Sequence, residues 1–308
     1  MHKKILIATD GSIHSQNAIG YAADAFQAAE DVQFCLLNIQ PLISQYLLEA
    51  SRTNGEAYDT LQKAISHNAA KSEKMLSRDR MILVRQGIDE RRVQTVSRPR
   101  MFGQAKDILL YAHRHWFDTL VVGRRGLTRV QKVFMGSTSA KLMEHAAVLP
   151  ICIVDSDATL NRMLVALDAS EDTMAIVDYL AMMLAHHPRV RVTVCHVRLD
   201  HSEVSGYPNG IGPSLAKLIA RSEEKWHSQF WPNARQRLNS AGIGDDRIEL
   251  IDLPRKGRIA KMILNEAETG HYDTVVLGRS GTGKAFYFGR VARYVCERLT
   301  DKALWLIG

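Results

Sequence analysis

The sequence contains two similar halves, and this internal repeat constrains the fold more than any other feature. The stretch "KILIATDGS" at residues 4–12 matches "RMLVALDAS" at residues 162–170. Further along, "FDTLVVG" at residues 117–123 matches "YDTVVLG" at residues 272–278. Because the offset between matching stretches is nearly constant, both halves are expected to adopt one common fold.

The end of the repeat defines the expected domain boundaries. The stretch that begins at Gly136 aligns without gaps with the stretch that begins at Gly289. The polar segment "DSDATLN" separates the two halves. We therefore expect one domain at residues 1–155 and a second at residues 162–308, each of ordinary domain size.

Each half alternates short apolar runs with longer stretches of helical period. In the first half this pattern predicts strands near residues 3–9, 32–39, 92–97, 118–123 and 150–154, and helices over residues 13–29, 57–84, 103–115 and 137–146. The strands are rich in Ile, Leu and Val without polar alternation, which is typical of a parallel sheet covered on both faces. We expect an open, doubly wound α/β sheet, with ligands beyond the carboxyl ends of its strands.

Composition narrows the class of protein further. The formal net charge of +7 is spread along 308 residues, so nucleic-acid binding is not indicated. No apolar run reaches the roughly 18 residues that a membrane span needs, and the early first strand leaves no room for a signal peptide. Single cysteines in apolar stretches indicate buried, reduced thiols: Cys35, Cys152, Cys195 and Cys296. These features predict a cytoplasmic protein without membrane spans.

The loop after the fourth strand carries a glycine pattern. It reads Gly123, two residues, Gly126, nine residues, Gly136 and Ser137, followed by Thr138. Glycines let the backbone approach a ligand closely, and a helix that begins at Gly136 would offer free N–H groups to an anion. The hydroxyls of Ser137 and Thr138 can donate to phosphate oxygens. The alternative is that Ser137 only caps a helix and the glycines only form turns.

This G-x2-G-x9-G-S spacing, with "ATDGS" at the end of the first strand, resembles the ATP-binding subclass of the universal stress protein family. The likeness extends over nearly the whole chain as two tandem domains, and "DTLVVG" and "LPICIV" fit the fourth and fifth strands. The resemblance implies the Rossmann-like, adenine-nucleotide-binding α/β fold with five parallel strands per domain. It also implies that the fifth strands pair the two domains, within the chain or in a homodimer.

The resemblance further implies a role for each strand end of the first half. Asp10 would face the ribose and a Mg²⁺ associated with the phosphates, since Mg²⁺ prefers oxygen ligands. Ala8 and Thr9 would form part of the ribose and base wall, and Ile39 would hold the adenine edge through its main chain. The residues implied to take the phosphates are Gly123, Gly126, Gly136, Ser137 and Thr138, with Ser139 as a weaker candidate. Arg124 is a further candidate, because it lies inside the same loop. Asp10 also suits a plain turn or helix cap, and Arg124 suits a solvated loop position.

The second half keeps part of this pattern. Its corresponding residues are Asp168, Val197, Gly278, Gly281 and Gly289. Between Gly281 and Gly289 there are seven residues rather than nine, and Arg290 replaces the serine. We therefore expect a second site that is degenerate or takes a different ligand. The stretch "GRSGTGKA" in this loop has the spacing of a nucleotide-hydrolysing P-loop, but the repeat aligns it with the Gly123 loop and assigns the helix start to Gly289.

The leading hypothesis is a cytoplasmic stress-response or signalling protein that binds ATP or another adenine nucleotide in its first half. Any hydrolysis is expected to be slow, because no residue resembles a dedicated base or an arginine finger. An interaction module with vestigial pockets is the alternative from another class. A nucleotide-processing enzyme of the same broad fold is disfavoured, because "TDGSIHSQ" and "LDASEDTM" match neither the H-x-G-H nor the S-G-G-x-D-S signature.

Overall fold

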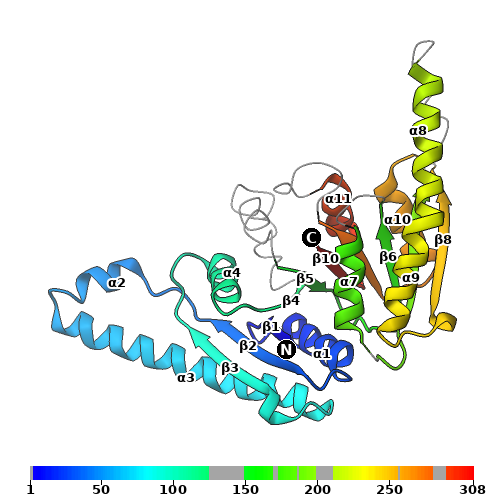
Figure 1. Cartoon of the computed structure of the whole chain (residues 1–308). Coiled ribbons are helices and arrows are strands. Elements are labelled where there is room, and N and C mark those ends of the chain that lie inside the picture. The colour runs from blue at the N-terminus through cyan, green and yellow to red at the C-terminus, as the bar shows by residue number, and fades with distance from the viewer. Residues whose placement is uncertain are drawn as a thin grey trace. The chain divides into compact units, whose positions relative to one another are not determined.

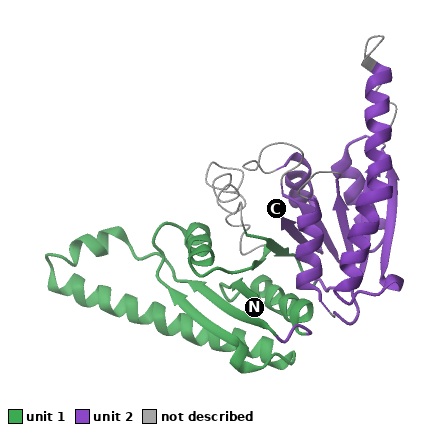
Figure 2. Cartoon of the chain, viewed as in Figure 1, with its two compact units in different colours: residues 1–27, 31–157 green, residues 28–30, 158–308 purple. Residues whose placement is uncertain are grey.

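The computed structural model describes residues 3–124, 149–168, 173–185, 187–198, 211–255, 257–279 and 289–308. The chain divides into two compact units (Figure 2). Unit 1 comprises residues 1–27 and 31–157, and unit 2 comprises residues 28–30 and 158–308. Both units consist of parallel strands and helices, so the predicted α/β class is confirmed.

The sheet of unit 1 has the order β3-β2-β1-β4-β5. Its strands are β1 (Lys3–Ala8), β2 (Val32–Ile39), β3 (Val93–Arg98), β4 (Thr119–Gly123) and β5 (Ile151–Val154). All neighbouring strands run parallel. The central strand β1 pairs with β2 on one side and β4 on the other, so the strand order reverses at β1. At that point the carboxyl ends of a doubly wound sheet leave a crevice for a ligand.

Helices cover the two faces of this sheet (Figure 1). They are α1 (Ile13–Phe26), α3 (Gly55–Arg85) and α4 (Gln104–Arg114), while α2 (Gln45–Ala50) contacts α3 and a 3₁₀ turn lies at Glu90–Arg92. α1 contacts β4 and β5, α3 contacts β2 and β3, and α1 and α3 contact each other. α4 packs on β2. The core lies where the apolar strands meet these helices, and Ile5, Leu6 and Ile7 of β1 are fully buried.

The predicted strands agree with the structure to within one residue at each end. The predicted helix at 13–29 ends earlier, at Phe26, although Ala28 and Ala29 extend its apolar pattern. α2 was not predicted, because its six residues are too few to show a helical period. The predicted helix at 137–146 lies outside the described residues.

Unit 2 repeats this arrangement with the order β10-β9-β6-β7-β8. Its strands are β6 (Arg162–Leu167), β7 (Arg191–Arg198), β8 (Ile248–Pro254), β9 (Thr274–Gly278) and β10 (Ala303–Ile307). Its helices are α7 (Thr173–Met183), α8 (Ile211–Lys225), α9 (Trp231–Ser240), α10 (Ile259–Thr269) and α11 (Arg290–Arg298), with a π-helical turn at Trp226–Phe230 and a 3₁₀ turn at Asp245–Arg247. α11 begins directly after Gly289, where the repeat predicts a helix start. None of the helices among the described residues is both long and apolar enough to span a membrane.

One helix of unit 1 offers a simple stability test. Gly20 lies inside α1, and among the described residues outside this helix a Cβ atom there would meet only Nε2 of Gln86, at 3.4 Å. Because glycine costs a helix interior about 0.5–1 kcal/mol relative to alanine, Gly20→Ala is expected to raise the free energy of unfolding by that amount. Urea denaturation of the purified variant measures it, and a destabilised variant would contradict the prediction.

Candidate functional site

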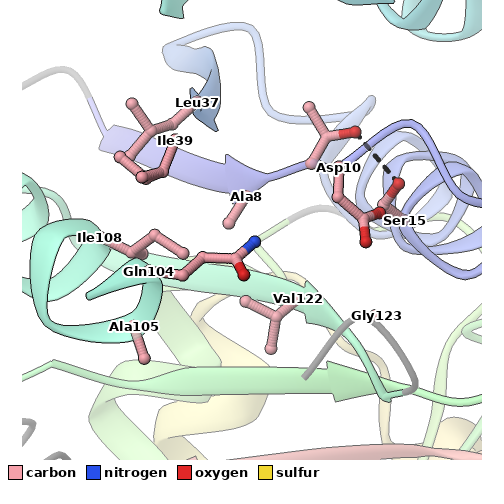
Figure 3. Close-up of a pocket in the computed structure, with 11 residues that line it drawn as sticks. Ala8, Asp10, Ser15, Leu37, Ile39, Gln104, Ala105, Ile108, Val122 and Gly123 are labelled. Atoms are coloured by element: carbon pink, nitrogen blue, oxygen red, sulfur yellow. Dashed lines mark hydrogen bonds between the residues drawn. The ribbon is translucent and has the colours of Figure 1, made fainter. Parts of the chain in front are cut away.

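A pocket opens at the carboxyl ends of β1, β2 and β4, beside the first turns of α4 (Figure 3). It is lined by Ala8, Thr9, Asp10, Ser15, Leu37, Ile39, Gln104, Ala105, Ile108, Val122 and Gly123. The walls are mainly aliphatic and the polar groups come from the strand ends. Such a pocket suits a flat ligand with an apolar ring and polar substituents.

Three strands and one helix supply the apolar walls. Ala8 and Ile39 are the last residues of β1 and β2, and Val122 is the penultimate residue of β4. Ile108 faces them from α4, one turn after Gln104. The small side chain of Ala8 leaves the space between β2 and α4 open (Figure 3). Ala8 and Ile39, both predicted as site residues, therefore lie at the same pocket.

Asp10 supplies a negative charge beside the pocket. Partial burial favours its neutral acid form, but hydrogen bonds from Ser12 and Ser15 outweigh burial, so the pKa of Asp10 lies below its usual value. One of these bonds runs from the backbone N–H of Ser12 to Oδ1 of Asp10, at 3.0 Å. The carboxylate is therefore ionised at neutral pH and can accept a metal ion or a hydroxyl donor.

Gly123 and Arg124 begin the predicted phosphate loop. A Cβ atom on Gly123 would lie 2.4 Å from the carbonyl oxygen of His14, so β4 approaches the start of α1 too closely for any side chain. Nη1 of Arg124 lies 3.4 Å from Oδ2 of Asp155, and both side chains are largely buried. Each residue thus has a structural role in addition to the phosphate role, which stays a prediction. The other predicted phosphate residues, Gly126, Gly136, Ser137, Thr138 and Ser139, lie outside the described residues.

The corresponding edge of unit 2 has different contacts. Thr173 of α7 donates a hydrogen bond to Oδ1 of Asp168 at 2.8 Å, so this carboxylate holds the start of a helix. His196 occupies the position of Asn38, next to Val197 in the repeat. Its ring stacks on Trp226 with centroids 4.1 Å apart, and its Nε2 lies 3.1 Å from Oε2 of Glu223. Gly278 ends β9 and Gly289 and Arg290 begin α11, while Gly281 lies outside the described residues.

Sequence reasoning missed several lining residues. These are Ser15, Leu37, Gln104, Ala105, Ile108 and Val122. The sequence contains a signal for two of them. Gln104 and Ile108 are four residues apart at the start of a helix that follows a strand, and this spacing puts both side chains on one face of the helix. No comparable signal marks Ser15, whose hydroxyl lies 3.0 Å from that of Thr9.

Comparison with known proteins places both halves in one family. The family model described as "Universal stress protein family" matches residues 1–154 and 159–300. No curated protein matches the chain significantly.

Solved structures with the same overall fold cover both halves. A universal stress protein from Archaeoglobus fulgidus DSM 4304 is similar at 16% identity with a TM-score of 0.59, over 98% of this chain and 95% of that chain. A functionally unknown protein from Pseudomonas aeruginosa PAO1 is similar at 12% identity with a TM-score of 0.53, over 99% of this chain and 92% of that chain. At these identities the likeness establishes the fold alone.

Proposed function

Because the chain belongs to the universal stress protein family, we propose that its first half binds an adenine nucleotide, ATP foremost, in the pocket at the ends of β1, β2 and β4. One observation carries the proposal. An aliphatic slot and an ionised carboxylate, Asp10, lie together where the strand order reverses. A nucleotide requires both an apolar surface for its base and a polar edge for its ribose and phosphates.

The residues of the pocket divide these tasks. Ile39, Ile108 and Val122 would enclose the base, with the main chain of Ile39 at the adenine edge. Thr9 and Ala8 would form the wall beside the ribose. The glycine loop that starts at Gly123 would receive the phosphates at a helix N-terminus.

Mg²⁺ fits this arrangement as a partner of the nucleotide. The described residues include no group of three or more His, Cys, Asp or Glu side chains that could hold a metal ion. Mg²⁺ commonly binds through one or two carboxylates together with substrate phosphates. The ionised Asp10 fits such a shared ligand, and bound Mg²⁺ would neutralise phosphate charge beside it.

The proposed role is that of a cytoplasmic stress-response or signalling protein that acts through its bound nucleotide, with at most slow hydrolysis. Unit 2 favours a different task. Its loop between Gly281 and Gly289 has seven residues instead of nine, and Arg290 replaces the serine of the pattern. We propose that the corresponding site of unit 2 is degenerate or takes a different ligand, and an interaction module with vestigial pockets is the alternative function for the chain. Pairing of the two halves through their fifth strands, or of two chains, stays a prediction.

The test is isothermal titration of ATP with Mg²⁺ into the purified chain. The double variant Gly136→Ala and Ser137→Ala removes the predicted close approach and a hydroxyl donor, so affinity is expected to fall about tenfold or more. The matched control is Gly289→Ala with Arg290→Ala at the corresponding position of unit 2, which is expected to leave the affinity unchanged. Absence of binding by the wild type, or equal binding by the double variant, would refute the proposal.

A further inference from the structure

The loop that carries Asp10 is bonded to the long helix α3. The hydroxyl of Thr9 donates to Oδ2 of Asp79 at 2.6 Å, and the backbone N–H of Gly11 donates to Oγ1 of Thr9 at 3.1 Å. Nη2 of Arg78 donates to the carbonyl oxygen of Gly11 at 3.0 Å. The residues on both sides of Asp10 are thus held by two consecutive residues of α3.

Asp79 is the centre of these contacts. Its side chain is fully buried, and a buried carboxylate is costly unless it is paired and hydrogen-bonded. Both of its oxygens have partners, since Oδ2 accepts from Thr9 and Oδ1 accepts from Nε and Nη2 of Arg78 at 3.2 and 3.1 Å. Hydrogen bonds to a charged group are stronger than those between neutral groups, so the bond to Asp79 fixes the position of Thr9 relative to α3.

The backbone of the loop also fits α3 closely. Gly11 has a φ of +75°, a conformation that other residues rarely adopt. A Cβ atom there would lie 2.6 Å from Sδ of Met75 and 3.0 Å from Nη2 of Arg78. A side chain at Gly11 would therefore have to displace the ends of the Met75 and Arg78 side chains and adopt a strained backbone conformation.

The repeat shows that this arrangement is particular to unit 1. The position of Thr9 is taken by Leu167 in unit 2, and Leu167 has no hydroxyl to donate. The carboxylate of Asp168 there accepts from Thr173 of the following helix. Among the residues that the structure describes, only unit 1 has both a hydroxyl at this position, on Thr9, and a buried carboxylate on the covering helix, on Asp79.

We propose that Asp79 and Arg78 are positioning residues, which fix the β1–α1 loop so that the Asp10 carboxylate is directed to the metal-bound phosphates of the ligand. The ligand part of this inference rests on the proposed nucleotide function. The restraint on the loop is a property of the protein alone and can be measured without any ligand.

Hydrogen exchange tests the restraint directly. Asp79→Asn removes the charge that orders Thr9 and Arg78, so the backbone N–H of Gly11 is expected to exchange about tenfold faster or more. Asp59→Asn makes the same change at an exposed position of α3 and is expected to leave this exchange unchanged. If Asp79→Asn does not fold, the exchange of Gly11 is measured in Arg78→Lys instead. The Arg78 side chain is 56% exposed, so this variant is expected to fold. Lysine keeps the positive charge but cannot make the forked hydrogen bonds of arginine. Unchanged exchange at Gly11 in the folded variants overturns the proposal.

ATP affinity with and without Mg²⁺ tests the link to Asp10. The wild type is expected to bind ATP more tightly with Mg²⁺ than without it. In Asp79→Asn this increase in affinity is expected to be about tenfold smaller, while the affinity without Mg²⁺ stays within about twofold of the wild-type value. An equal loss in both conditions would indicate only general destabilisation and would overturn the positioning role. If the wild type binds no ATP, the proposed function fails, and the exchange of Gly11 alone decides whether Asp79 and Arg78 restrain the loop.

Discussion

Replacing Ala8 with leucine is expected to weaken adenine-nucleotide binding by about a hundredfold while unit 1 stays folded. Ala8 is only partly buried, and its methyl group borders the empty space between β2 and α4 (Figure 3). Leucine would place three more carbon atoms where the base is proposed to lie. A clash of this kind typically costs 1–3 kcal/mol, and about 2.8 kcal/mol corresponds to a hundredfold.

The repeat provides a matched control for this change. Ala166 holds the same position on β6 of unit 2 and is likewise half-buried. Ala166→Leu is expected to leave the titration curve unchanged, because unit 2 is not the proposed nucleotide site. Calorimetric titration of both variants, with circular dichroism to verify folding, makes the comparison. Full affinity in folded Ala8→Leu would place the nucleotide elsewhere.

The fold was predictable from sequence because its strongest signals are local. Each strand of unit 1 is a short apolar run, and each was predicted to within one residue. Helix ends were harder, since Ala28 and Ala29 continue an apolar pattern after α1 has ended at Phe26. α2 left no signal because six residues are too few to show a helical period.

The candidate site was predictable only in part. Ala8, Asp10 and Ile39 were named because the resemblance to the universal stress protein family implies a role for each, and in the structure all three line one pocket. The hydrogen bond from the Thr9 hydroxyl to Asp79 was not predicted, because the sequence of a long helix does not indicate which distant residue a buried carboxylate contacts. The same holds for Arg124, whose partner Asp155 lies beyond another strand. Side-chain partners that are far apart in sequence depend on packing, which composition and periodicity do not describe.

Gly123→Ala is expected to destabilise unit 1 by about 3 kcal/mol, the upper end for overpacking. The added Cβ atom would lie 2.4 Å from the carbonyl oxygen and 2.6 Å from the carbonyl carbon of His14, so the backbones of β4 and α1 would have to separate. The backbone of β4 is not free to yield, because Val121 and Val122 are paired with β1 and β5 and are buried. The free energy of unfolding of unit 1 in urea measures the effect.

Gly20→Ala is the control for this change, since the same added methyl group is expected to stabilise α1 where space exists. The pair of variants also separates two explanations of the glycine pattern. If Gly123→Ala keeps wild-type stability and loses only nucleotide affinity, Gly123 is required by the ligand and the close approach to His14 is not limiting. If stability falls as expected, the first glycine of the pattern is required by packing of β4 against α1, and the phosphate contacts must be made by the residues that follow it.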